Sequence, residues 1–151
     1  MGNLIKTDLA RLITLTAAVY QVWAALWGYA YPKAFFDMLT PIFDLAVKPI
    51  PVLQTINFIL GLATIAVEYP NRHDLNSAAW SSLSPYWPRS MIAKAVAYML
   101  FVLPCILMYQ TTNPAIYYFI AASVWAWGWA SGEEGLLARD VMKGEKGGEK
   151  A

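Results

Sequence analysis

Between Lys94 and Glu133 the chain runs for 38 residues without a charged side chain. As one helix this stretch would be about 57 Å long, almost twice the ~30 Å hydrocarbon core of a bilayer. The polar sequence Gln110-Thr111-Thr112-Asn113-Pro114 divides it, because proline disfavours helical geometry at the residue before it. The stretch therefore predicts two membrane spans, at about residues 94–109 and 114–131.

Two further uncharged stretches are each long enough to cross a bilayer once. They predict spans at about residues 12–31 and 49–67. The composition agrees, since 58% of the residues are hydrophobic and 14% are charged, against about 25% charged in a typical soluble domain. We therefore expect an all-α membrane protein with four transmembrane helices, in a domain of residues 1–135.

The connection between the first two spans, residues 33–48, is unusually apolar for a loop. Its charged residues fall near one helical face, which predicts a short interfacial helical segment. Asp37 and Asp44 could instead form the polar lip of a cavity or bind a cation, although Lys33 and Lys48 at i,i+4 spacing account for them as ion pairs. Residues 136–151 predict a short cytosolic tail that is partly disordered.

The basic residues are distributed unevenly between the two sides of the predicted membrane. Nine lie on the side of both termini and the second connection, and two lie opposite. Because Lys and Arg accumulate in cytoplasmic loops, this bias predicts a multi-pass integral membrane protein with cytosolic N- and C-termini. It does not distinguish the endoplasmic reticulum from the plasma membrane. The nine are Lys6, Arg11, Arg72, Arg89, Lys94, Arg139, Lys143, Lys146 and Lys150, and the two are Lys33 and Lys48.

Uncharged polar and small side chains inside the spans are the candidate packing or ligand-lining residues. Interhelical hydrogen bonding is the ordinary use of such amides, worth about 0.6–2 kcal/mol each, and lining a ligand pocket is the alternative. Small residues four apart on the fourth span, including a GxxxG pair, predict close approach to another helix. The candidates are Gln21, Gln54, Asn57, Ala122, Ala126, Gly128, Ala130 and Gly132.

The sequence offers little material for catalysis or metal binding. His73 beside Asp74 is the one arrangement that resembles an acid/base pair, but adjacent residues do not normally face each other on a helix. A single His and the single Cys105 make no metal motif, so we expect no metal site, no cofactor and no catalytic residue. The formal net charge of +1 gives no field that would attract nucleic acid.

Three parts of the sequence carry a resemblance to a known family. They are the opening NLIKTDLARLITLTAAVYQVWAALWGYAYPK, the YPNRH stretch and the aromatic fourth span. Together they resemble a family of small four-span fungal membrane proteins whose domain has no known function. The resemblance implies an integral membrane protein from a fungal-type cell and carries over no catalytic or ligand residues.

Two functions from different classes follow from these observations. The first is a non-enzymatic accessory or organising subunit that acts through helix packing, with the bilayer and a membrane protein or a second copy as partners. The second is a lipid- or sterol-binding membrane protein that uses Gln21, Gln54 and Asn57 within an aromatic cavity. A membrane enzyme using His73 and Asp74 is a third, less supported reading.

Overall fold

The computed structural model describes residues 5–35, 48, 50–69 and 90–133. Within them the chain forms four helices: α1 (Lys6–Ala30), α2 (Val52–Glu68), α4 (Met91–Leu107) and α5 (Thr112–Ala130). A short 3₁₀ turn, η2 (Tyr109–Thr111), connects α4 to α5. The described residues contain no strand, only an isolated antiparallel bridge between Ala34 and Met108. The all-α prediction is confirmed for this part of the chain.

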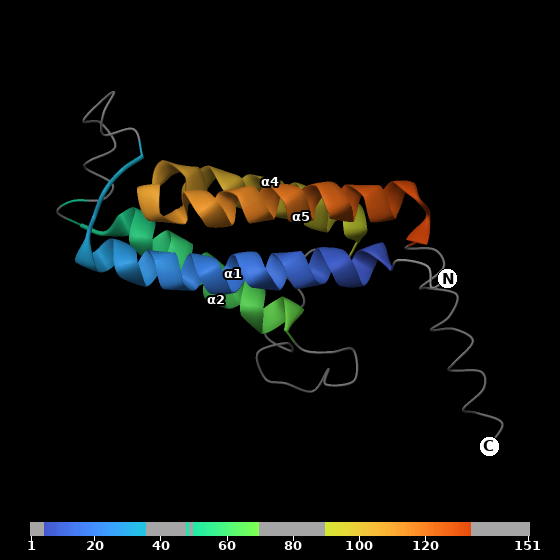
Figure 1. The fold of residues 1–151 in the computed structure, drawn as a ribbon, viewed down its shortest axis with the longest axis horizontal. Coiled ribbons are helices and arrows are strands. Elements are labelled where there is room, and N and C mark those ends of the chain that lie inside the picture. The colour runs from blue at the N-terminus through green and yellow to red at the C-terminus, as the bar shows by residue number, and fades with distance from the viewer. Residues whose placement is uncertain (1–4, 36–47, 49, 70–89, 134–151) are drawn as a thin grey trace, which may run out of the picture.

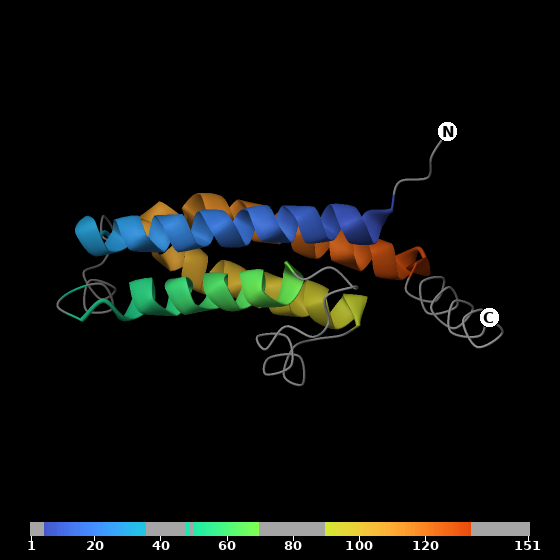
Figure 2. The same ribbon diagram turned by 90° about the horizontal axis from the view of Figure 1, so that it is seen from below.

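The helices lie along the long axis of the molecule, and consecutive helices are antiparallel (Figure 1). α1 packs on α2 and α5, and α5 packs on α4, whereas α2 and α4 touch each other much less. Figure 2 shows the same bundle from below, with the C-terminal end of α1 extending past its neighbours. We call this the turn end of the bundle, and the opposite end, where α1 and α4 begin, the charged end.

The helix boundaries follow from local chemistry. Ser90 caps α4, because its hydroxyl accepts a hydrogen bond from the backbone N–H of Ala93. α4 ends at Leu107, where Met108 turns to extended geometry and pairs with Ala34. The Thr111 hydroxyl then donates to the carbonyl oxygen of Cys105, 2.6 Å away, which ties η2 back to the end of α4.

The start of α1 receives its cap from the other end of the described chain. Its N-cap residue, Ile5, provides no side-chain acceptor. Instead, the carboxylate of Glu133 accepts hydrogen bonds from the backbone N–H groups of Lys6 and Thr7 at 3.2 and 3.3 Å. A carboxylate at this position also interacts favourably with the helix dipole, so Glu133 fixes the end of α5 against the start of α1.

Among the described helices, α1 alone is long and apolar enough to cross a bilayer by length and composition. α2 and α4 are apolar but have 17 residues each. The number of spans therefore stays a prediction. The expected interfacial segment and the C-terminal tail fall mostly or wholly outside the described residues, at 36–47 and 134–151.

Small side chains fill the interior and let the helices approach closely. Where α1 crosses α2, a Cβ placed on Gly61 would lie 2.7 Å from Cγ2 of Val22 and 3.2 Å from the carbonyl oxygen of Ala18. A contact of 2.7 Å forces a shift, because real Cβ atoms do not approach other atoms so closely. The core between α1, α4 and α5 is formed by Ala10, Ala17, Ala18, Met91, Ala95, Tyr98, Cys105, Ala115, Tyr118, Ala122 and Trp125.

We expect Gly61→Ala to destabilise the bundle and Gly128→Ala to be tolerated. The added methyl at 61 pushes α1 and α2 apart, at a cost of about 1–3 kcal/mol. At 128 the nearest atom lies 3.5 Å away, so the helix propensity of alanine, favoured over glycine by about 1 kcal/mol, should dominate. Thermal unfolding of the two variants in detergent measures the difference, and equal effects would contradict the close α1–α2 crossing.

Candidate functional site

Four polar side chains from four helices meet in the interior of the bundle. Gln21, Asn57, Cys105 and Tyr118 are all fully buried, and we call them the polar core. The side-chain amide of Gln21 donates to Oδ1 of Asn57 at 3.0 Å and accepts from the Tyr118 hydroxyl at 2.7 Å. The Cys105 thiol donates to the same Asn57 oxygen at 3.3 Å. These bonds join α1, α2, α4 and α5 at one level.

Asn57 makes further contacts with the backbone. Its Nδ2 donates to the carbonyl oxygens of Leu53 at 2.9 Å and Pro104 at 3.0 Å. Proline lacks the N–H that would continue the hydrogen-bond pattern of α4, and Asn57 adds a bond between α2 and α4 at this point. The polar core is therefore a set of groups that satisfy one another, which is an arrangement that holds helices together.

Gln54, the third candidate amide, lies closer to the turn end. It is fully buried, and its Nε2 donates to the carbonyl oxygen of Gly28 at 3.4 Å. The structure thus brings Gln21 and Asn57 together and places Gln54 separately, between α1 and α2. None of the three lines the pocket described below.

The small-residue candidates of α5 differ in how deeply they are buried. Ala122 is in the core and Ala126 packs against it, whereas Ala130 is exposed. Gly128 is buried, and a Cβ placed there would lie 3.5 Å from the Met91 sulfur.

Gly132 does not make the helix contact expected of the GxxxG pair. It follows the end of α5 with a φ of 72°, and a Cβ there would meet none of the described atoms within 4 Å. Its backbone conformation, which glycine adopts without a steric penalty, serves the turn that leads to Glu133.

An ion pair of a buried carboxylate, Glu68, with a half-buried ammonium, Lys94, lies at the charged end of the bundle. Glu68 is 3% exposed, and its Oε1 accepts from the Lys94 ammonium at 2.6 Å and from the Tyr98 hydroxyl at 2.5 Å. The Lys94 ammonium also lies 4.5 Å from the centre of the Trp125 ring. Arg11 donates to the backbone oxygen of Glu68 at 2.6 Å. These contacts link all four helices at this end.

The sequence held a signal for this pair. Glu68 closes the second apolar stretch and Lys94 opens the third, so consecutive antiparallel helices place the two opposite charges at the same end of the bundle. Only Tyr98 and the depth of burial required the tertiary structure. Within the residues that the structure describes, no three His, Cys, Asp or Glu side chains are placed to hold a metal ion. His73 and Asp74 lie outside those residues.

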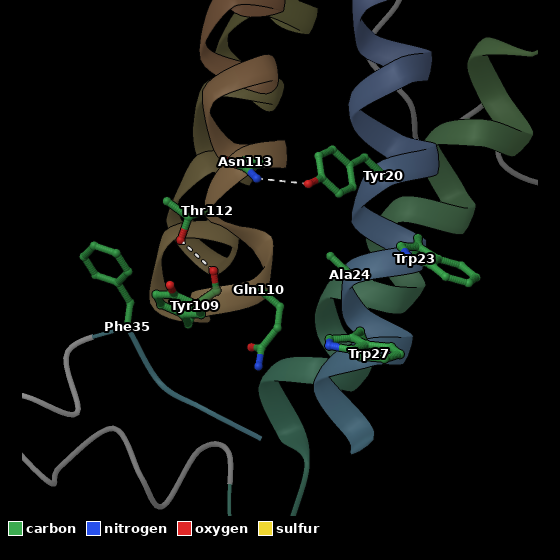
Figure 3. A pocket seen from close by; sticks show the side chains of 9 residues that line it. All are labelled: Tyr20, Trp23, Ala24, Trp27, Phe35, Tyr109, Gln110, Thr112 and Asn113. Carbon is green, nitrogen blue, oxygen red and sulfur yellow. Dashed lines mark hydrogen bonds between the residues drawn. The ribbon is translucent and has the colours of Figure 1, made fainter. Parts of the chain in front are cut away.

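A pocket of about 650 Å³ opens near the turn end, between α1 and the start of α5. Figure 3 shows two tryptophans of α1 on one side and the residues of η2 and α5 on the other. On α1 the lining positions recur at i, i+3, i+4 and i+7, so they share one helical face. This spacing, together with the polar turn at 110–113, could have indicated the pocket from sequence. The lining residues are Tyr20, Trp23, Ala24, Trp27, Phe35, Tyr109, Gln110, Thr112 and Asn113.

Hydrogen bonds fix the polar wall of this pocket. Asn113 Nδ2 donates to the Tyr20 hydroxyl oxygen at 2.9 Å, and Gln110 Nε2 donates to the carbonyl oxygen of Tyr31. Among the other lining residues of the pocket, Phe35 stacks on Tyr109 with ring centres 6.5 Å apart. The Lys33 ammonium lies 5.3 Å from the centre of the same Tyr109 ring.

Comparison with known proteins yields a family and no function. The model of a domain of unknown function, DUF7727, matches residues 1–133. Neither the curated proteins nor the solved structures contain a match.

We expect Tyr118→Phe to destabilise the bundle by about 1–3 kcal/mol, because it leaves the buried Gln21 oxygen without its donor. Tyr117→Phe is the matched control, since Tyr117 is the neighbouring residue of α5 and is 40% exposed. Thermal unfolding in detergent compares the two. Equal stability of both variants would contradict the polar core as a stabilising element.

Lys94→Met should destabilise the protein strongly, by about 3–5 kcal/mol, because it leaves the buried Glu68 carboxylate without its cation. Glu68→Leu should cost less, because the Lys94 ammonium that it leaves unpaired is 17% exposed. The double variant should recover much of that loss, since two apolar side chains of similar size can replace a buried ion pair. A double-mutant cycle by thermal unfolding measures the coupling. Strictly additive losses would contradict a direct interaction between the two residues.

Proposed function

The chain belongs to the DUF7727 family, a domain of unknown function, and we propose from its own residues that it is a four-span membrane protein. In this proposal it performs no catalysis and serves as an accessory or organising subunit of a larger membrane assembly. The four spans and the fungal-type source implied by the sequence resemblance are part of the same proposal.

The observation that carries the proposal is the distribution of side chains between inside and outside. Alanine, threonine, glutamine and asparagine occupy much of the interior. Large apolar side chains face outward on all four helices, among them Leu12, Val19, Trp23, Ile56, Ile59, Leu62, Val96, Leu100, Leu103, Ile116, Phe119 and Ile120. A soluble bundle has the opposite pattern, because exposing many large apolar side chains to water costs free energy.

Lipid or another membrane protein is the natural surrounding for such a surface. The 17 to 25 residues of the helices correspond to about 25–37 Å, close to the thickness of a hydrocarbon core. With nine basic residues predicted on one side and two on the other, the charged end faces the cytosol. Glu68 and Lys94 then lie at the cytosolic edge, paired with each other.

The buried polar side chains bond to one another, which favours an accessory role over a transport role. Gln21, Asn57, Cys105 and Tyr118 bond to one another, and the Glu68–Lys94 ion pair lies at the charged end of the bundle. Proton and ion pathways use ionisable groups along the span. What the bundle offers a partner is its outward apolar surface, suited to a membrane protein or a second copy of this chain.

Lipid or sterol binding is a second candidate function. The specific observation in its favour is the pocket near the turn end, whose residues differ from the three amides proposed from sequence. Gln21 and Asn57 hydrogen-bond to each other within the polar core, and Gln54 donates to the backbone of α1.

The test is purification of the tagged full chain in a gentle detergent, with mass spectrometry of co-purifying proteins. We expect a partner or a second copy at a fixed ratio. One outward-facing apolar side chain per helix is replaced by alanine: Val19→Ala, Ile59→Ala, Leu100→Ala and Phe119→Ala. At least one of these variants should lose the partner or second copy, while the free energy of unfolding changes by less than about 0.5 kcal/mol. Asn57→Leu is the control that should impair assembly and stability together.

Two outcomes would contradict the proposal. The first is a monomer without a stoichiometric partner in native-like lipid. The second is a His73→Ala chain of normal abundance that fails to complement a deletion strain, which would favour the enzymatic reading. Glycosylation acceptor sites report the topology in the same cells: modification is expected within 33–48 and not within 70–89.

A further inference from the structure

The residues that line the pocket near the turn end lie at two levels along α1. Trp27 and Gln110 lie toward the turn end, and Tyr20 and Asn113 lie closer to the charged end (Figure 3). At 1.5 Å per residue, Tyr20 is about 10 Å from Trp27 along the helix. In the proposed membrane orientation Trp27 marks the outer interface and Tyr20 lies deeper in the bilayer. An amphiphile in this pocket therefore has its head at the Trp27 level and its apolar part toward the bilayer centre.

An exposed surface for the apolar part continues inward from the Tyr20–Asn113 level. Three large side chains follow Asn113 at i+3, i+4 and i+7, so they share its helical face. They are Ile116, Tyr117 and Ile120, which are 56%, 40% and 42% exposed. The rings of Tyr20 and Tyr117 lie 6.4 Å apart and join α1 to α5 at this level. An acyl chain over these side chains would run parallel to α5 and remain in hydrocarbon.

The Tyr20–Asn113 pair supplies hydrogen-bond donors at the inner level. Asn113 Nδ2 donates one of its two hydrogens to the Tyr20 oxygen at 2.9 Å. Its second hydrogen and the phenolic hydrogen of Tyr20 are then left for other acceptors. The ester carbonyls of a phospholipid are acceptors without a hydrogen of their own, and they lie inside the phosphate, toward the acyl chains. Two donors below the outer interface suit such carbonyls.

The outer level has a cation beside it. Lys33 is exposed, and its ammonium lies 5.3 Å from the centre of the Tyr109 ring, which lines the pocket. Cation–π attraction holds the ammonium there and leaves its hydrogens for an anion. All nine lining residues are formally neutral, so Lys33 adds the positive charge. Figure 3 shows the indole nitrogen of Trp27 on the side that faces Gln110, where its N–H is a further donor.

We propose that the pocket binds an anionic phospholipid, with its phosphate at Lys33 and Trp27, its ester carbonyls at Tyr20 and Asn113, and its acyl chains along α5. The inference rests on the proposed membrane placement and gives the lipid-binding candidate an orientation and a headgroup charge. Lys33 favours a headgroup without a cation of its own. An ammonium such as that of phosphatidylethanolamine would be repelled by Lys33 and would meet no carboxylate among the lining residues.

Two photoreactive phosphatidylglycerol probes test the orientation, with the full chain in phosphatidylcholine vesicles. One probe carries a diazirine on the headgroup, and the other carries it near the middle of an acyl chain. We expect the headgroup probe to label residues 27–35 and 109–110 and the chain probe to label residues 113–120. Peptide mass spectrometry maps both. The reverse order, or labels spread evenly over all four helices, would overturn the inference.

Competition tests the headgroup charge and the need for acyl chains. Replacing part of the phosphatidylcholine with unlabelled phosphatidylglycerol should displace both probes. The same replacement with phosphatidylethanolamine should not displace them, because its headgroup carries an ammonium. Glycerol 3-phosphate, which has the phosphate without acyl chains, should also leave the labelling unchanged. Displacement by phosphatidylethanolamine equal to that by phosphatidylglycerol, or displacement by glycerol 3-phosphate, would contradict a site for an anionic lipid.

Substitutions at the two levels complete the test. Lys33→Gln should lower labelling by the headgroup probe about tenfold, because a charge-assisted hydrogen bond to the phosphate is lost. Lys48→Gln is the matched control, since Lys48 is also exposed but does not line the pocket, and labelling should not change. Tyr20→Phe/Asn113→Leu should lower labelling by both probes several-fold.

Thermal unfolding of each variant separates lost binding from lost fold. Should the Tyr20→Phe/Asn113→Leu variant unfold, the exposed Lys33 position decides the question. Unchanged labelling in Lys33→Gln would overturn the inference, and this is the result expected if Lys33 pairs with Asp37 instead of a phosphate. An equal loss in Lys48→Gln would also overturn it, because the effect would then come from the charge of the outer side as a whole.

Failure of this inference is separable from failure of the proposed function. The glycosylation pattern and the ratio of co-purifying protein are measured on the same chain without added phosphatidylglycerol. Lost headgroup specificity with four spans and an intact partner ratio would overturn the lipid site alone. A topology with fewer spans would overturn both, because the pocket would no longer lie at a membrane interface.

Discussion

The hydrogen bond between Gln21 and Asn57 is the contact through which the buried side chains of all four helices are joined. It joins α1 to α2, and its two amides also receive the Tyr118 hydroxyl from α5 and the Cys105 thiol from α4. In apolar surroundings a polar group without a partner costs several kcal/mol, so each amide restricts the helices to arrangements that satisfy it. Helix packing by small residues alone would allow many more rotations and registers.

The two ends of the bundle are closed by different chemistry. At the charged end, Glu68 pairs with Lys94, Arg11 bonds to the end of α2 and Glu133 caps α1, so each of these bonds connects separate segments. At the turn end, backbone pairing of Ala34 with Met108 brings the chain after α1 across the α4–α5 turn. The pocket lies beside this crossing, because α1 extends past its neighbours there (Figure 2).

Much of the helical architecture could be read from the sequence, and most of the site could not. Uncharged stretches located all four helices, and the polar turn before Pro114 separated the last two. The boundaries shifted where specific contacts intervened: α2 continues through Glu68 because its carboxylate finds Lys94 and Tyr98 inside the bundle. Gly132 does not make the helix contact predicted for the GxxxG pair, because α5 ends at Ala130, before that residue.

The sequence by itself determined which segments are helical and which side chains must find partners away from water. It did so because hydropathy and charge act along the chain, residue by residue, and a buried amide needs a hydrogen bond in any arrangement. Only the tertiary structure decided which partners meet: Gln21 with Asn57 and Tyr118, Glu68 with Lys94, and Tyr20 with Asn113. Those pairings depend on how each helix is rotated about its axis and shifted along it relative to the others. Short-range sequence patterns do not specify this for residues up to 97 positions apart in the chain.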